Sequence, residues 1–203
     1  MEHTSNNCAQ LRGRFVTLPA LSHENHGRKF YSFFLEVERL SGTADTLRVL
    51  VPEDVLYRAD LSGGDMLAVS GQVRSYNSHT PDGRKLHIFL YALQMDACCG
   101  EFANDVALTG AICKPPVLRR TPLGREICDV MLAVNRSRHR SDYLPCILWG
   151  RTAQQIAACP VGTQLALQGR LQSRQYVKSL PQGAETRTAY EISVRAAQPL
   201  PSL

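Results

Sequence analysis

The feature that most constrains this chain is a repeat of its own pattern at a spacing of 97 residues. Gly13 corresponds to Gly110, and the alignment runs without a gap as far as Asp45 and Asp142. A few added residues bring three further pairs into line: Gly64 with Gly162, Gly71 with Gly169, and Pro81 with Pro181. Glycines, strands and turns that recur in one order at a fixed period predict two copies of one structural unit.

Each copy predicts the same succession of strands. Alternating apolar residues at 30–39 (FYSFFLEVER) and 127–136 (ICDVMLAVNR) indicate half-buried strands, and each follows a loop that contains proline. A Pro-x-Gly turn near the end of each copy predicts a hairpin into the last strand. Glycines inside strands, such as Gly71 and Gly169, predict bulges or sharp bends.

A short helix is expected between the strands of each copy. In the second copy Ala153, Ile156 and Ala157 lie at i, i+3 and i+4 and so share one helical face. Five strands with one short helix between the third and the fourth is the order of the OB-fold, a five-stranded Greek-key barrel. The sequence thus predicts an all-β chain of two tandem OB-folds, at residues 6–97 and 104–198, joined by a linker at 98–103.

The two copies differ in charge. Residues 1–100 carry 10 Lys and Arg against 11 Asp and Glu, whereas residues 101–203 carry 13 against 7. The net charge of +5 therefore arises entirely in the second half of the chain. This asymmetry favours a polyanionic partner for the second copy, although a solvated basic surface also explains it.

Cofactors, metals and catalysis find little support in the sequence. The seven cysteines are odd in number and form no CxxC pair, and the six histidines are scattered, so neither a disulfide framework nor a metal site is expected. The usual phosphate-loop and nucleophile motifs do not occur. Without an apolar run near ~20 residues or a secretory start, we expect a cytoplasmic protein that uses no cofactor, does not enter membranes and is not an enzyme.

Several motifs of the second copy occur in an order typical of a known family. They are Leu118-Arg119 with Thr121-Pro122 and Gly124, the run LAVNR at 132–136, the step LWGR at 148–151, and Gly169-Arg170-Leu171 with Ser173-Arg174. Through these motifs, residues 104–197 resemble the bacterial single-stranded DNA-binding proteins (SSB). The first copy resembles the family more weakly, through its layout and the segment GQVRSYN at 71–77.

The resemblance implies three aromatic side chains on which bases stack: Tyr143, Trp149 and Tyr176. Each stacked base contributes roughly 1–3 kcal/mol to binding. Each of the three could instead be a core or interface aromatic. The first copy has Pro52 in place of Trp149 and Thr46 near the position of Tyr143, so stacking is expected mainly in the second copy.

Arginines surround these aromatic positions and offer both phosphate contacts and flat surfaces for bases. Three of them stand at alternate positions in NRSRHRSD, 135–142, and would project together from an extended loop. A flexible, solvated loop is the alternative. The candidate DNA-binding arginines are Arg119, Arg120, Arg125, Arg136, Arg138, Arg140, Arg151, Arg170 and Arg174.

We therefore expect a nucleoid-associated protein that binds single-stranded DNA without reading its sequence, in replication, repair or recombination. The alternative is an OB-fold interaction module of a primosome or mobile element, with little or no DNA binding. By the resemblance, two-unit members of the family form dimers with four OB-folds. A homodimer is therefore expected, with a monomer as the alternative.

The first copy is the expected contributor to that dimer. Its apolar strands at 30–37 (FYSFFLEV) and 85–93 (KLHIFLYAL) could form the interface, although both could equally be barrel core. The acidic C-terminal tip through which the family recruits partners has no counterpart in the closing residues AAQPLPSL. Recruitment by such a tip is therefore not expected.

Overall fold

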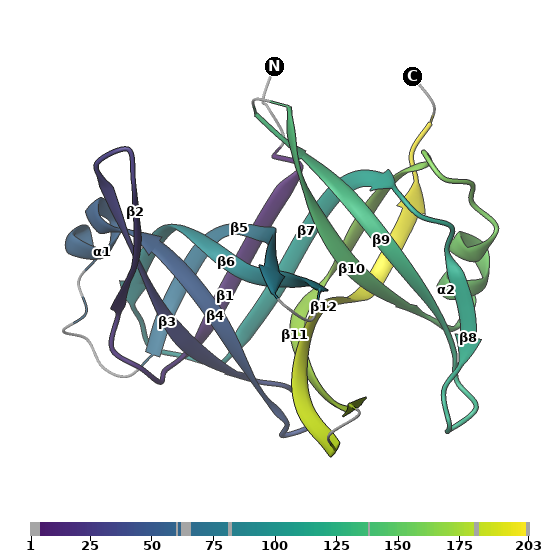
Figure 1. The fold of residues 1–203 in the computed structure, drawn as a ribbon, viewed down its shortest axis with the longest axis horizontal. Helices are drawn as coiled ribbons and strands as arrows, with labels where there is room; N and C mark the ends of the chain where they lie inside the picture. Colours follow the sequence, from purple (N-terminus) through teal and green to yellow (C-terminus); the bar gives the residue numbers. More distant parts are fainter. Residues whose placement is uncertain are drawn as a thin grey trace.

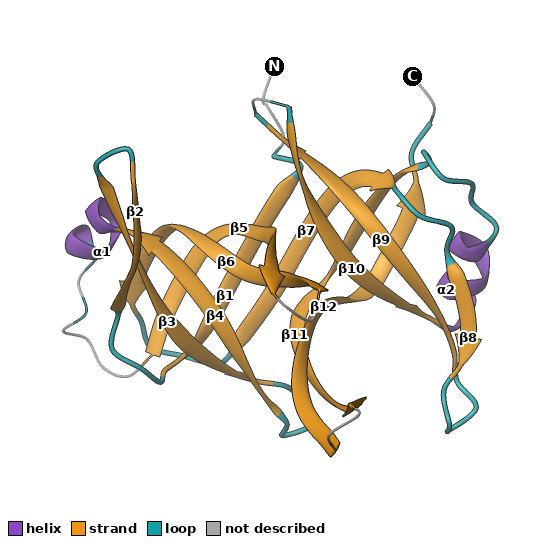
Figure 2. Cartoon of the chain, in the orientation of Figure 1, coloured by secondary structure: helices purple, strands orange, loops and turns teal. Residues whose placement is uncertain are grey.

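The computed structural model describes residues 5–59, 61, 66–80, 83–137, 139–180 and 183–201. Figures 1 and 2 show a chain made largely of strands, arranged as two barrels that each carry one short helix. Within the described residues no helix is long and apolar enough to cross a membrane. The predicted all-β class with two tandem OB-folds is confirmed.

The first barrel closes in the order β1-β3-β4-β6-β5 and back to β1. All of these neighbours are antiparallel except β4 and β6, which are parallel. The helix α1 lies between the third and fourth barrel strands, as in an OB-fold. The elements are β1 (Asn7–Phe15), β2 (Ala20–Asn25), β3 (Arg28–Glu38), β4 (Ala44–Pro52), α1 (Glu53–Arg58), β5 (Met66–Thr80) and β6 (Gly83–Ala97).

The second barrel repeats this arrangement in the order β7-β9-β10-β12-β11 and back to β7, with β10 and β12 parallel. The elements are β7 (Ala103–Ile112), β8 (Val117–Arg120), β9 (Glu126–Arg136), β10 (Arg140–Trp149), α2 (Gly150–Ala157), β11 (Gln164–Leu180) and β12 (Gly183–Pro199). The residues before Gly83 and Gly183 in the two predicted Pro-x-Gly turns lie outside the described residues.

The structure differs from the sequence-based expectation just before the second strand of each barrel. A simple proline-bearing loop is predicted there, but β2 pairs with β3 and β8 pairs with β9. All side chains of β2 and β8 are exposed. Because neither strand buries a face, neither carries the apolar alternation that reveals a strand in a sequence.

Apolar side chains at alternate positions of the long strands fill the cores of both barrels. Inward-pointing residues of β3 are matched by buried counterparts in β9: Phe33 with Val130, Leu35 with Leu132, and Val37 with Val134. The helix α2 packs on β9 and β10 with Ala153 and Ile156 fully buried and Ala157 partly buried. The helical face predicted from their spacing is therefore confirmed.

Two glycines allow the barrel walls to bend. The β5–β6 ladder shifts register at Gly71 and the β11–β12 ladder shifts at Gly169, which confirms the predicted bulges. A Cβ atom at either position would collide with a carbonyl oxygen of the facing strand, that of Tyr91 at Gly71 and that of Ser193 at Gly169. The backbones approach too closely there for any side chain.

The barrels join through β1 and β7, which pair antiparallel in the middle of one continuous sheet (Figure 1). In this ladder Ala9 faces Val106, which is its own counterpart in the repeat. One residue away, Cys8 faces Ala107 and Gln10 faces Asp105, and these two pairs are counterparts of each other in the repeat. The register therefore relates the two barrels by an approximate two-fold axis that passes between Ala9 and Val106.

A buried aspartate ties the first barrel to a strand of the second. Asp45, at the start of β4, is fully buried and accepts hydrogen bonds from the N–H (2.7 Å) and the hydroxyl (3.0 Å) of Ser173 on β11. Arg39 donates to both carboxylate oxygens of Asp45, at 2.7 and 2.6 Å, and to the carbonyl oxygen of Ser173 at 2.9 Å. The Asp45 hydrogen bond raises the pKa of Arg39, so its guanidinium group stays charged.

The two-fold counterpart of this clamp lies on the other side of the junction. Asp142 is also fully buried and accepts a hydrogen bond from the N–H of Ser75 on β5 at 2.6 Å. Arg136 and Arg74 approach its carboxylate at 3.2 and 3.3 Å. Burial raises the pKa of Asp142, and the Ser75 N–H and the two guanidinium groups oppose that shift. Neither strand can move away without leaving buried polar groups unpaired.

We expect Asp45→Ala to lower the free energy of unfolding by roughly 3–5 kcal/mol, because Arg39 and the Ser173 N–H lose their buried acceptor. Asp105→Ala is the matched control: its ion pair with Arg195 is exposed and contributes at most about 1 kcal/mol. Urea unfolding followed by circular dichroism measures both losses. Equal losses would show that the buried clamp has no special part in holding the barrels together.

Candidate nucleic-acid interface

A groove on the second barrel gathers many of the residues that the sequence singles out. It has a volume of about 500 Å³ and is walled by β8, β10, β11 and β12. Guanidinium groups bind phosphates and stack on flat rings, so this lining suits a polyanion that carries aromatic rings. Five predicted residues line it, namely Trp149, Arg119, Arg125, Arg170 and Arg174, together with Arg39, Gln172 and Glu191 among others.

Trp149 is positioned by the end of β10. Its backbone is extended, so its side chain points outward while the preceding Leu148 is fully buried. The indole Nε1–H donates a hydrogen bond to the Ser193 hydroxyl on β12, at 3.3 Å. The side chain remains 39% exposed, so part of the ring is free to stack against a flat ligand.

The other two predicted aromatics lie outside the groove lining. Tyr143 is 44% exposed on the same outer face of β10 as Trp149, and its N–H donates to the hydroxyl of Ser75 on the first barrel at 2.8 Å. Tyr176, on β11, is 38% exposed. The guanidinium carbon of Arg174 lies 5.7 Å from the centre of the Tyr176 ring, and Arg174 itself lines the groove. Tyr176 thus continues the groove along the hairpin.

The arginines of the groove differ in how firmly they are held. Arg119 forms an ion pair with Asp129, and Arg174 lies 3.6 Å from Glu191. Arg125 stands in the turn between β8 and β9, where no described residue forms an ion pair with it. An incoming phosphate competes with a carboxylate at Arg119 and Arg174, but not at Arg125.

In the segment NRSRHRSD, 135–142, Asn135 and Arg136 pair with Ser141 and Arg140 in the β9–β10 ladder, so these described residues belong to strands and not to an extended loop. Arg136 faces Arg140 directly across the β9–β10 ladder. Arg136 turns toward the buried Asp142, whereas Arg140 is exposed. Arg138 lies outside the described residues. In this arrangement Arg136 already has a buried partner, and Arg140 is the described arginine of the hairpin that faces solvent.

Two further predicted arginines also lie outside the groove lining. Arg120 forms an ion pair with Glu126 at 3.2 Å. Arg151 is exposed on the first turn of α2, two residues after Trp149. No group of His, Cys, Asp or Glu side chains within the described ranges could hold a metal ion.

The sequence reasoning missed Arg39, which enters the groove from the first barrel. Its guanidinium is held by Asp45 and Ser173, and its charge adds to the effect of burial in lowering the pKa of Arg170. The repeat carries the signal that could have found it, because Arg39 aligns with Arg136, which was singled out. The groove therefore draws on both barrels.

Comparison with known proteins gives a consistent result for the second barrel. Residues 103–200 match the model of the single-strand binding protein family. Single-stranded DNA-binding protein B of Bacillus subtilis is 40% identical over 80 residues, covering 36% of this chain and 71% of that protein. Single-stranded DNA-binding protein A of the same organism is 32% identical over 103 residues, covering 47% of this chain and 60% of that protein. The chain thus spans only part of the length of these relatives.

Among solved structures, the wild-type single-stranded DNA binding protein from Thermus aquaticus is similar with a TM-score of 0.77, over 97% of this chain and 93% of that chain. The sequence identity is 20%, so this similarity concerns the fold, including the presence of two barrels in one chain. The sequence match to the Bacillus relative, which extends over most of that protein, goes further: this chain belongs to the single-strand binding protein family.

Proposed function

We propose that this protein binds single-stranded DNA without reading its sequence, mainly through the groove of the second barrel. The observation that carries the proposal is the joint exposure of Trp149 and a set of arginines in that groove. Unpaired bases expose the flat faces that Trp149 can stack on, and phosphates follow the guanidinium groups. A duplex hides its base faces in the stack and does not fit this chemistry.

The names of the Bacillus and Thermus relatives support the same function. On this proposal the chain is a binding protein rather than an enzyme, and it acts in the cytoplasm, at the nucleoid. Single strands are exposed during DNA replication, repair and recombination, and we place its role there. Tyr143, Tyr176, Arg140 and Arg151 lie outside the groove lining and would contact the strand as it leaves the groove.

We also propose that two chains form a dimer with four barrels. In the apolar strands at 30–37 and 85–93, Phe33, Leu35 and Leu90 are barrel core and are not free to form an interface, whereas Phe34 and Leu93 are exposed. A better candidate is the outer face of β7, β11 and β12. It is a shallow hollow of about 340 Å³ lined by small or uncharged residues such as Ala107 and Ala166, where two sheets could pack closely.

Replacing the stacking ring tests the groove directly. We expect Trp149→Ala to weaken binding to oligo(dT) by about 1–3 kcal/mol, because one base loses its stacking surface. Trp149→Phe should recover most of that loss, and Ser193→Ala, which removes only the indole hydrogen bond, should have a smaller effect. Fluorescence anisotropy of a labelled oligonucleotide measures all three. An unchanged affinity for Trp149→Ala, with unaltered thermal stability, would assign this tryptophan a purely structural role.

The salt dependence of binding tests the arginines. Each phosphate neutralised on a single strand contributes about −0.7 to the slope of log affinity against log salt. The double variant Arg125→Ala/Arg170→Ala should therefore make the slope shallower by about 1.4. Arg136→Ala should leave the slope unchanged, since Arg136 is already paired with Asp142. The reverse result would place the phosphate track on the β9–β10 hairpin instead of in the groove.

Light scattering tests the dimer. The full chain should have twice the monomer mass of 22.5 kDa. Ala107→Arg, which puts a charge in the centre of the shallow face, should shift the mass to that of a monomer. A wild-type monomer at concentrations where DNA is bound would contradict the proposed dimer, and a dimeric Ala107→Arg variant would place its interface elsewhere.

A further inference from the structure

The groove of the second barrel contains a carboxylate that phosphate binding does not explain. Among the described residues that line the groove, Glu191 is the only acidic one, and it lies among five arginines. Its side chain is only 8% exposed, so its charge is largely removed from water, which is unfavourable. Its negative charge also repels phosphates. Glu191 therefore indicates a role in the groove other than binding the backbone of the strand.

The alternation of side chains along β12 places Glu191 beside the tryptophan. Ile192 and Val194 belong to the barrel core, so Glu191 and Ser193 lie next to each other on the outer face. The hydroxyl of Ser193 accepts the hydrogen bond from the Trp149 indole. Two residues along a strand span roughly 7 Å. The carboxylate thus lies next to the ring on which a base is proposed to stack.

The contacts of Glu191 leave part of its carboxylate free to accept hydrogen bonds. Its Oε1 accepts a hydrogen bond from the side-chain amide of Gln172, its cross-strand neighbour on β11, at 2.9 Å. Its Oε2 lies 3.6 Å from Nε of Arg174, which is an ion pair but is longer than a hydrogen bond. A carboxylate offers about four acceptor positions. Within the described residues, Oε2 therefore has room for a donor from a ligand.

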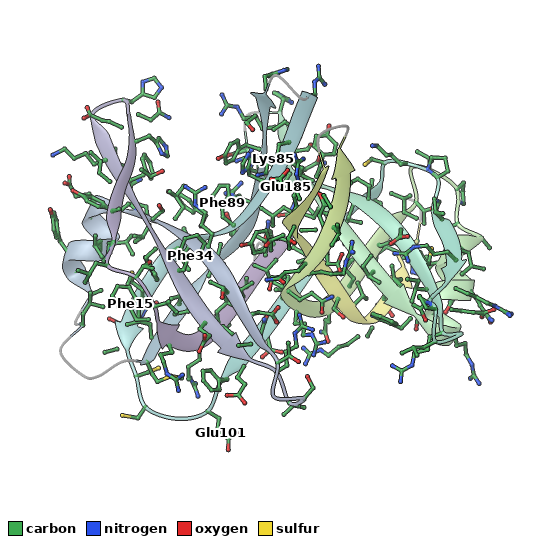
Figure 3. The ribbon with its side chains drawn as sticks, turned by 60° about the horizontal axis from the view of Figure 1, so that its bottom comes forward. Phe15, Phe34, Lys85, Phe89, Glu101 and Glu185 are labelled. Atoms are coloured by element: carbon green, nitrogen blue, oxygen red, sulfur yellow. The ribbon has the colours of Figure 1, made fainter. Side chains whose placement is uncertain are left out.

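The first barrel shows that the fold does not require a carboxylate at this position. Arg74 faces Phe89 in the first barrel, and its counterpart in the repeat, Gln172, faces Glu191 in the second. Phe89, on the first barrel in Figure 3, thus holds the position equivalent to Glu191. Because an apolar ring fits the same place in the same fold, Glu191 belongs to the chemistry of the second groove.

The four bases differ in what their edges offer to a carboxylate. Cytosine, adenine and guanine each carry an exocyclic amino group, and the cytosine amino group is a common donor to Glu and Asp in DNA recognition. Thymine has no amino group. Its single N–H lies between two carbonyl oxygens, which a carboxylate repels. An acceptor beside the stacking ring therefore distinguishes thymine from the other three bases.

We propose that Glu191 sets a base preference in the groove: its carboxylate accepts a hydrogen bond from the exocyclic amino group of the base stacked on Trp149, which favours cytosine, adenine and guanine over thymine. This inference rests on the proposed function of the groove and refines it. Stacking and phosphate contacts bind a strand of any sequence. The carboxylate adds a graded preference for the base at one position.

Oligo(dC) and oligo(dU) test the preference, because uracil has an oxygen where cytosine has its amino group, and the two rings have the same size. A homopolymer presents the same base to Trp149 in every register. A length of about 10 nucleotides lies within the range that one OB-fold covers. Quenching of Trp149, the only tryptophan in the chain, reports binding at this groove.

The variant is Glu191→Gln in the full chain, which keeps the size of the side chain and removes its charge. We expect the ratio of the Kd for oligo(dC) to the Kd for oligo(dU) to be about fivefold higher in the variant than in the wild type, because the cytosine amino group loses its charged acceptor. A purely structural role would change both Kd values alike and leave the ratio unaltered.

Two further variants sharpen the test. Glu185→Gln is the matched control, since it removes a carboxylate from the same strand, where the side chain is 51% exposed and lies outside the lining of this groove. It should keep the wild-type ratio even if both oligonucleotides bind more tightly. Glu191→Phe copies the residue of the first barrel and should raise the ratio as Glu191→Gln does, which provides a second measurement if the Gln variant is unstable.

The outcomes separate this inference from the proposed function. An unchanged or lower ratio in the Glu191 variants, with Trp149 still quenched, would overturn the inference and leave Glu191 as a partner of Arg174. An equal rise of the ratio in Glu185→Gln would overturn it too, because the effect would then be one of overall charge. If neither oligonucleotide binds the wild type, by quenching or by anisotropy, the proposed function itself fails.

Discussion

The antiparallel pairing of β1 with β7 is the contact on which the rest of the molecule depends. It converts two separate barrels into one continuous sheet and gives them an approximate two-fold relation. Backbone pairing alone would leave the barrels able to twist against each other. The buried carboxylates of Asp45 and Asp142 resist this, because each accepts a hydrogen bond from a serine N–H of the other barrel. Their desolvation is offset only while these partners stay in place.

This junction also shapes the binding surface. The clamp at Asp45 holds the stretch of β11 that carries Arg170 and Arg174, and it delivers Arg39 to the groove of the second barrel. On the other side, Ser75 links Asp142 and the N–H of Tyr143. The same buried contacts that orient the barrels therefore position groups of the candidate interface. A change at the junction would alter the groove even though no ligand touches the aspartates.

Equivalent strand positions carry different side-chain chemistry in the two barrels. The backbone positions are equivalent, yet the second barrel has Arg174 and Glu191 where the first has Tyr76 and Phe89. At these positions the first barrel presents aromatic rings and the second barrel presents charged side chains. This difference agrees with the net charge of the halves, where the basic surplus lies wholly in residues 101–203.

Much of this was determined by the sequence itself. The 97-residue repeat predicted two copies of one unit. Within each copy, local patterns predicted the elements: the alternation in β3 and β9, the bulge glycines and the helical face of α2. Such patterns arise wherever side chains alternate between core and solvent. Of the site residues predicted from the family motifs, Trp149 and four arginines line one groove. Only the tertiary structure decided the rest. The exposed strands β2 and β8 bury no face, Arg136 is drawn to a buried aspartate, Arg39 crosses to the other barrel, and Tyr76 meets Phe89 across a ladder. Each of these depends on contacts between residues distant in the chain, and local patterns carry no information about which distant groups will meet.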